Sequence, residues 1–179
     1  MPLESANPNN APNTLPPTAR PEVPFLVKIF ASGLFSGYSP VASGTVGSLV
    51  ALAIYFLPGF EQPSIILPVG FLAFVLGVNA AEQMERKYGH DPSEVTIDEV
   101  VGMWISLLLL PKSLLVAAGA FLLFRVFDII KPFPARKFDN VTGGLGIMMD
   151  DVVAGFYTNL IMHLLVALSV FDKLNSLIR

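Results

Sequence analysis

Two apolar segments in the middle of this 179-residue chain are too short to cross a membrane singly, and this limits how the chain can fold. They occupy residues 100–110 and 114–124, and Pro111 and Lys112 separate them. Each covers about half of the roughly 20 apolar residues that a spanning helix needs. The pair therefore forms either one kinked span or a short hairpin that returns to its starting side.

Three further apolar segments flank this pair, at residues 46–57, 64–81 and 152–171. The chain is 53% hydrophobic and only 14% charged, whereas a soluble domain is about 25% charged. The segments show neither the alternation typical of strands nor a repeat, so we expect helices. The sequence predicts an all-α, membrane-associated helical bundle of about five to six helices with a short inner hairpin.

Composition also sets the limits of the domain and excludes several functions. Residues 1–24 are rich in Pro and Asn, which predicts a disordered tail before a single helical domain at residues 25–179. They lack the pattern of a cleavable signal. A net charge of -3 without a basic run argues against nucleic acid binding. The absence of cysteine excludes disulfides, thiolate metal ligands and a cysteine nucleophile.

The basic residues favour the hairpin over the kinked span. Under the positive-inside rule, Arg20 and Lys28 place the N-terminal tail in the cytoplasm, and the connection at residues 58–63 has no Lys or Arg. By the same rule, the chain must return to the cytoplasm before each of two later groups of basic residues. The first group is Arg86 and Lys87, and the second is Lys131, Arg136 and Lys137. The hairpin satisfies this requirement, although it leaves Lys173 and Arg179 outside, against the rule.

Acidic residues gather at the ends of the apolar segments, as Asp98-Glu99, Asp128 and Asp150-Asp151. Carboxylates beside apolar segments are costly unless they are paired, hydrated or bound to a cation. The hairpin topology brings all three groups to one face of the membrane. We therefore predict a single site there, and oxygen ligands of this kind suit a hard cation.

Structural roles compete with this hypothesis at two of the three groups. Thr96 and Glu99 match a capping box, which would account for Glu99 and leave Asp98 free. Asp150 or Asp151 would serve as the N-cap of the last helix. Two adjacent acids exceed what a cap requires, so the Asp150-Asp151 group favours a functional role.

The remaining acid, Asp128, lies between two bases. Arg125, Asp128 and Lys131 recur at a spacing of three on one predicted helix, which Pro132 ends. An Arg125–Asp128 ion pair is the simple interpretation. The alternative is a face for a metal-bound phosphate, with Asp128 on the metal and the two bases on phosphate oxygens.

Two segments rich in small residues lie beside these acids. The glycines of residues 143–146, Gly144 among them, would let the backbone approach a ligand closely, but the spacing fits no dinucleotide motif. Residues 43–48 match either tight helix packing or a phosphate cradle at a helix N-terminus, with Thr45 as a candidate contact. Packing is the interpretation that we favour for residues 43–48.

Together these motifs resemble the phosphatidylglycerophosphatase A family over residues 29–159. The resemblance rests on their order along the chain, at residues 39–49, 90–102, 124–132 and 143–155. The family often has Pro where this chain has Ser43.

The resemblance implies a Mg²⁺-dependent enzyme that converts phosphatidylglycerophosphate to phosphatidylglycerol and phosphate. It would be a multi-pass protein of the cytoplasmic membrane with its active site facing the cytoplasm. The implied metal ligands are Asp98, Asp128, Asp150 and Asp151. Arg125, Lys131, Thr45 and Gly144 would contact the phospholipid substrate. The catalytic residues would be Asp98, Glu99, Asp128 and Asp151, with Glu99 or Asp151 accepting a proton from water.

Two other classes of protein compete with this hypothesis. A transporter with an acidic ion-coupling site would place its charges near the middle of spanning helices, whereas these lie at segment ends. A CDP-alcohol phosphotransferase needs a longer aspartate signature than the one at residues 150–155. The oligomeric state and the acyl-chain preference stay open.

Overall fold

The computed structural model describes residues 21–138, 141–171, 173 and 176. Most of the predicted tail, together with Arg20 and Arg179, lies outside the described residues. The described part is all-helical, as predicted, and contains no strand. Its elements are α1 (Phe25–Ala31), the 3₁₀ helix η3 (Ser36–Tyr38), α2 (Ser43–Tyr55), α3 (Pro63–Tyr88), α4 (Ile97–Ser106), α5 (Leu114–Ile130), α6 (Ala135–Phe138) and α7 (Gly144–Ala167).

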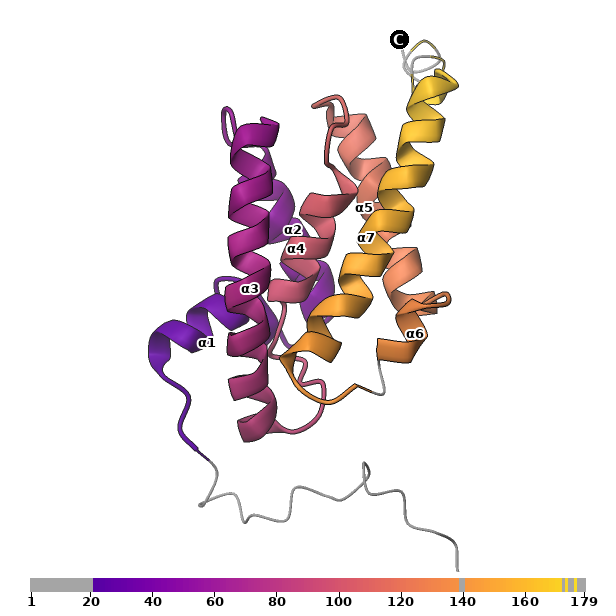
Figure 1. Cartoon of the computed structure of the whole chain (residues 1–179). Helices are drawn as coiled ribbons and strands as arrows, with labels where there is room; N and C mark the ends of the chain where they lie inside the picture. The colour runs from indigo at the N-terminus through magenta and orange to yellow at the C-terminus, as the bar shows by residue number, and fades with distance from the viewer. Residues whose placement is uncertain (1–20, 139–140, 172, 174–175, 177–179) are drawn as a thin grey trace, which may run out of the picture.

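The four longest helices, α2, α3, α5 and α7, run up and down beside one another, and the shorter α4 lies among them (Figure 1). It packs against α2, α3, α5 and α7. At one end of the bundle α3 and α5 finish while α4 and α7 begin, which is the lower end in Figure 1. We call this the acidic end, because Asp98 and Asp151 lie in helices that begin there. The opposite end, the far end, holds the α2–α3 and α4–α5 connections.

The predicted hairpin is confirmed. Helix α4 leaves the acidic end, and α5 returns to it (Figure 1). At the turn, the Lys112 ammonium donates to the Leu57 carbonyl at 2.9 Å and to Glu61 Oε2 at 2.6 Å. Both partners belong to the α2–α3 connection, so the hairpin reaches the far end of the bundle. The alternative of a single kinked span is wrong.

Several helix limits differ from those predicted. Helix α7 begins at Gly144, eight residues before the apolar segment that was expected to form it, and α3 continues through charged residues to Tyr88. The short helices α1 and α6 raise the number of α-helices in the described part to seven, above the expected five to six. Among the described helices, α3 and α7 are long and apolar enough to cross a membrane.

Helices α4 and α7 cross at two glycines, which allow unusually close packing. A side chain at Gly102 would lie 2.7 Å from the Asp151 carbonyl oxygen, and one at Gly155 would lie 2.5 Å from the Gly102 carbonyl oxygen. Small residues let helix backbones approach in this way. The crossing holds the beginnings of α4 and α7 together at the acidic end.

Candidate metal centre and phosphate site

Three carboxylates from two helices meet at the acidic end. Asp98 and Glu99 lie in the first turn of α4, and Asp151 lies in the second turn of α7. One oxygen from each of them lies within 4.8 Å of the others. Asp98 is 8% exposed and Asp151 only 2%, so water has little access to this triad.

Each member of the triad has an oxygen that no hydrogen bond satisfies. Asp98 Oδ1, Glu99 Oε2 and Asp151 Oδ1 are buried without a hydrogen-bond partner in the described part of the chain. Ionised oxygens in that position are costly, because burial removes water and the neighbouring carboxylates repel them. A hard divalent cation would remove both costs at once. The residues present therefore fit a metal ion.

The structure rules out the two capping roles that competed with this site. Thr96 is the N-cap residue of α4 but makes no side-chain capping bond, and its hydroxyl lies 2.8 Å from Ser36 Oγ. The capping box with Glu99 is thus absent. Asp150 and Asp151 are not N-caps either, because α7 begins at Gly144 and its N-cap residue is Gly143.

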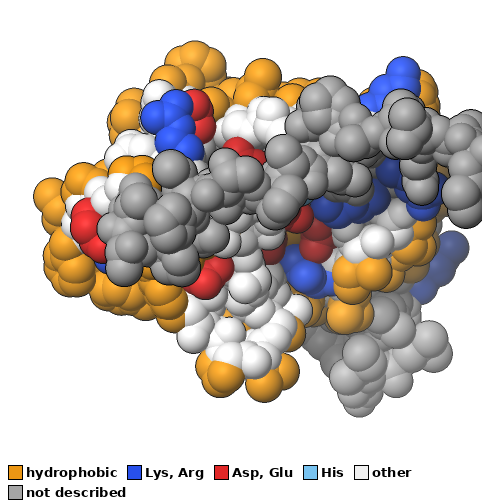
Figure 2. Space-filling view, turned by 90° about the horizontal axis from the view of Figure 1, so that it is seen from below, with side chains coloured by type: hydrophobic (Ala, Val, Ile, Leu, Met, Phe, Trp, Pro, Cys, Tyr) orange, Lys and Arg blue, Asp and Glu red, His pale blue; other side chains and the backbone are white. Residues whose placement is uncertain are grey.

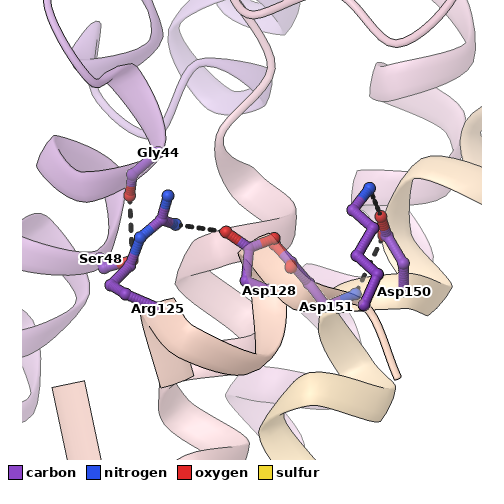
Figure 3. A network of polar contacts seen from close by, with 7 residues as sticks. Gly44, Ser48, Arg125, Asp128, Asp150 and Asp151 are labelled. Atoms are coloured by element: carbon purple, nitrogen blue, oxygen red, sulfur yellow. Dashed lines mark hydrogen bonds and ion pairs between the residues drawn. The ribbon is translucent and has the colours of Figure 1, made fainter. Parts of the chain in front are cut away.

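Arg125 and Asp128 form the expected ion pair beside the triad (Figure 3). Arg125 Nη1 lies 2.8 Å from Asp128 Oδ2, on consecutive turns of α5. The Asp128 charge is close enough to repel those of Glu99 and Asp151. Arg125 Nε is buried and has no hydrogen-bond partner among the described residues, so this guanidinium retains a donor for an anion.

Asp150 is not a member of the triad and pairs with a different partner (Figure 3). The Lys131 ammonium donates to Asp150 Oδ2 at 2.6 Å, and the Asp151 amide donates to Asp150 Oδ1 at 2.9 Å. Lys131 has a φ of 47° at the end of α5 and so turns out of the helix toward α7. Arg125 and Lys131, which were predicted to share one helix face, therefore bind different carboxylates: Arg125 binds Asp128, and Lys131 binds Asp150.

The beginning of α2 borders the triad directly. A side chain at Gly44 would lie 2.2 Å from Glu99 Oε1 and 3.0 Å from Arg125 Nη1. Ser48 donates to the Gly44 carbonyl at 2.9 Å within the same helix. Thr45 is partly exposed next to this contact, and its predicted role in substrate binding stays a prediction. Residues 43–48 thus pack closely, which is the interpretation favoured from the sequence, and Gly44 packs against Glu99 and Arg125 of the site.

Gly144 lies against the backbone of α3. A side chain there would lie 1.8 Å from the Val78 carbonyl oxygen, so close packing alone requires the glycine. Its predicted contact with substrate stays a prediction.

Sequence reasoning missed the role of Glu85, near the end of α3. Its carboxylate accepts a hydrogen bond from the Gly143 amide at 2.7 Å and lies 2.7 Å from His90 Nδ1. It thus joins the turn after α3 to the beginning of α7, which carries Asp151. The only signal in the sequence was a charged segment that continues an apolar helix.

Acidic and basic side chains thus lie close together at this end, and apolar side chains surround much of its edge (Figure 2). Residues 29–166 match the family model described as phosphatidylglycerophosphatase A. This chain belongs to that family. The resemblance noted in its motifs is confirmed, and the membership makes the chain a lipid phosphatase that associates with a membrane.

Three named relatives support the assignment. A Bacteroides thetaiotaomicron protein described as a candidate phosphatidylinositol-3-phosphatase is 43% identical over 75% of this chain and 89% of its own. The phosphatidylglycerophosphatase A of Escherichia coli is 44% identical over 71% of this chain and 76% of its own. The phosphatidylglycerophosphatase A of Haemophilus influenzae is 37% identical over 76% of this chain and 86% of its own. No solved structure matches this chain.

Proposed function

We propose that this protein is a Mg²⁺-dependent phosphatase that hydrolyses phosphatidylglycerophosphate to phosphatidylglycerol and phosphate. The observation that carries the proposal is the group of three unsatisfied carboxylate oxygens beside Arg125. A buried acidic site for a cation next to an arginine suits a phosphate ester, which carries negative charge and binds both. Two relatives named phosphatidylglycerophosphatase A support the choice of substrate.

Asp98, Glu99 and Asp151 would hold the metal, because Mg²⁺ prefers carboxylate oxygens. When bound there, Mg²⁺ supplies charge neutralisation for the phosphate and a more acidic water. Glu99 thereby joins the ligands that the sequence suggested. Asp128 and Asp150, which pair with Arg125 and Lys131, are not metal ligands in this proposal.

The chain's own residues would then bind phosphate and move a proton. Arg125 and Lys131 donate to the phosphate oxygens and offset the charge that develops on them. A water oxygen forms a bond to phosphorus as the bond from phosphorus to the glycerol oxygen breaks. Asp128, beside the triad, accepts the water's proton and returns it to the departing glycerol oxygen, so that an alcohol and inorganic phosphate leave.

We further propose that the acidic end faces the cytoplasm from a multi-pass position in the inner membrane. Lys131, Arg136 and Lys137 follow α5 at this end, and Arg86 and Lys87 end α3 there. Basic residues of this kind are retained on the cytoplasmic side of membrane proteins.

The decisive experiment is phosphate release by the purified protein in detergent micelles, with Mg²⁺ or with EDTA. We expect hydrolysis of phosphatidylglycerophosphate that EDTA abolishes and that Asp151→Asn and Asp128→Asn remove. Phosphatidylinositol 3-phosphate belongs in the same assay, because one relative's name includes that lipid. Preference for the inositol lipid would overturn the proposed substrate, and activity untouched by EDTA would overturn the metal.

A further inference from the structure

Large apolar side chains project outward from residues 25–38, close to the acidic end. Phe25 is 67% exposed, Leu26 77% and Leu34 62%, and Phe35 and Tyr38 are also exposed. The rings of Phe25 and Phe35 lie 6.1 Å apart, as do those of Phe35 and Tyr38. The segment thus presents a continuous aromatic surface, which we call the aromatic segment. In water such a surface is unfavourable, and it marks a binding face.

An unusual backbone holds two of these side chains outward. Leu34 and Phe35 have φ values of 58° and 69°, a left-handed conformation that bulky residues rarely adopt. Hydrogen bonds maintain it, from the Leu34 amide to the Ile29 carbonyl at 2.9 Å and from the Phe35 amide to Ser32 Oγ at 3.1 Å. Strain kept in place in this way indicates a functional requirement for the exposed side chains.

An apolar cavity of about 250 Å³ lies beneath the aromatic segment. Leu34 and Phe30 border it from one side, and α2, α3 and α4 border it from the others through Ile54, Leu72, Leu76 and Trp104. Leu72 and Leu76 are themselves exposed on the outer face of α3, one of the two candidate membrane spans. The cavity thus joins the aromatic segment to the surface that a bilayer would cover.

The aromatic segment is also attached to the beginning of α4. The Thr96 amide donates to the Ala31 carbonyl at 2.9 Å, and Ser36 Oγ lies 2.8 Å from Thr96 Oγ1. A side chain at Gly37 would lie 2.1 Å from the Glu94 carbonyl oxygen. Asp98 of the carboxylate triad follows Thr96 by two residues. The position of the aromatic segment relative to a bilayer would therefore fix the position of the site relative to that bilayer.

We propose that the aromatic segment is an interfacial anchor that inserts Leu34, Phe35 and the neighbouring apolar side chains into the bilayer beside the acidic site. Aromatic residues next to a basic residue are typical of the membrane–water interface, and Lys28 lies within α1. Insertion would hold the triad at the level of the lipid headgroups.

The bilayer fits this surface better than a second copy of the chain does. The exposed surface continues through the apolar cavity onto Leu72 and Leu76 of a spanning helix, where lipid is the natural neighbour. Flexible acyl chains fill an irregular cavity of this kind without needing a complementary shape. A second copy would leave this continuity unexplained.

The absence of cysteine makes a direct test possible. Single-cysteine variants Leu34→Cys and Phe35→Cys carry a small fluorophore, and each protein is reconstituted into phosphatidylcholine–phosphatidylglycerol vesicles. Quenching is measured with lipids brominated on the acyl chains and with aqueous iodide. Phe71→Cys, at an exposed position within α3, is the lipid-facing control, and Arg86→Cys, at the charged end of that helix, is the water-facing control.

The anchor predicts quenching by brominated lipid at positions 34 and 35, as at position 71, and protection from iodide. Iodide quenching equal to that at position 86 would overturn the proposal. Protection from both quenchers would also overturn it, because another protein surface would then cover the segment. This test does not depend on the phosphatase activity.

A kinetic test follows from the proposed function and can fail separately from it. The double variant Leu34→Ser/Phe35→Ser removes exposed side chains only, so we expect it to fold, as circular dichroism would verify. In mixed micelles its KM, expressed as the mole fraction of lipid substrate, should rise about tenfold while kcat changes little. An unchanged KM would contradict the anchor, whereas loss of kcat alone would point to a structural role.

Discussion

Asp98 and Asp151 each lie four residues before the glycine at which their helices cross. Gly102 follows Asp98 by one turn of α4, and Gly155 follows Asp151 by one turn of α7. Residues four apart share a helix face, so the same close approach that joins the glycines brings the carboxylates together. The distance between these two proposed metal ligands thus depends on two glycines, which have no side chain to bind a metal.

Gly155→Ala tests this dependence. The added methyl would meet the Gly102 carbonyl at 2.5 Å, and we expect a loss of about 1–3 kcal/mol in stability. Spreading the carboxylates should also reduce phosphate release, on the order of 100-fold for a displacement of about 1 Å. Thermal unfolding in detergent and the phosphate assay provide the measurements. Gly70→Ala in α3 is the control, because its methyl meets nothing within 4 Å.

Asp151→Asn should have opposite effects on stability with and without metal. In EDTA the variant is expected to unfold at a higher temperature than the native chain, because one of several clustered buried charges is gone. Mg²⁺ should raise the unfolding temperature of the native chain and leave the variant unchanged. Glu82→Gln, at a solvent-exposed position where Glu82 pairs with Arg86 outside the triad, is the matched control. Equal stabilisation of both proteins by Mg²⁺ would show that the ion binds elsewhere.

Gly44→Ala should disturb the triad from the side of α2. Its methyl would lie 2.2 Å from Glu99 Oε1, so Glu99 must move. We expect Mg²⁺ affinity, measured by titration calorimetry, to fall by roughly 10–100-fold, as when a group supporting a ligand is lost. Ser43→Ala, at the neighbouring partly exposed position, should bind Mg²⁺ normally.

The Lys131–Asp150 pair should contribute measurably to stability because it is largely shielded from water. The side chains are 23% and 12% exposed, and their charged atoms lie 2.6 Å apart. Lys131→Met and Asp150→Asn should each cost about 1–3 kcal/mol, and the double variant should cost less than their sum. Unfolding of the four proteins under one set of conditions gives the coupling energy. Strict additivity would mean that the two residues act independently.

The Glu61–Lys112 pair at the far end should make stability depend on pH. The hydrogen bond from Lys112 lowers the pKa of Glu61 below its ordinary value of 4.5. The pair therefore stabilises the folded state above about pH 4.5, and this contribution disappears as the pH falls through the lower folded pKa. Glu61→Gln should lower the unfolding temperature at pH 7, and this effect should shrink as the pH is lowered below 4.5. A difference between the two proteins that does not shrink on acidification would contradict this assignment.

The sequence singled out the acidic residues of the site but not their grouping: it predicted Asp98, Asp128, Asp150 and Asp151 as metal ligands, whereas the structure brings Asp98, Glu99 and Asp151 together. Asp98, Glu99 and Asp151 stood out because carboxylates at the ends of apolar segments need a partner. Asp150 carries the same carboxyl group next to Asp151, yet it pairs with Lys131. That outcome depends on where α7 begins, because the helical phase decides which of two neighbouring residues faces the triad.

The beginning of α7 could not be predicted from local propensity. Glycine is a poor helix former, so residues 143–146 were expected to form a loop. In the structure Gly144 and Gly146 lie inside the helix, against the Val78 and Val141 carbonyl oxygens. Tertiary packing that only glycine allows outweighs the propensity here. The hairpin, by contrast, followed from segment length and charge, which are properties of the sequence alone.

The length of α3 has a consequence for how the enzyme meets its substrate. Its 26 residues extend roughly 39 Å, about 9 Å more than the hydrocarbon thickness of a bilayer. In the proposed orientation this excess carries Glu85, which holds the beginning of α7, and it would place the reaction site at the membrane surface. Catalysis would then be confined to two dimensions: we expect encounter frequency to follow lateral diffusion and surface density, with the diacylglycerol moiety never leaving the leaflet.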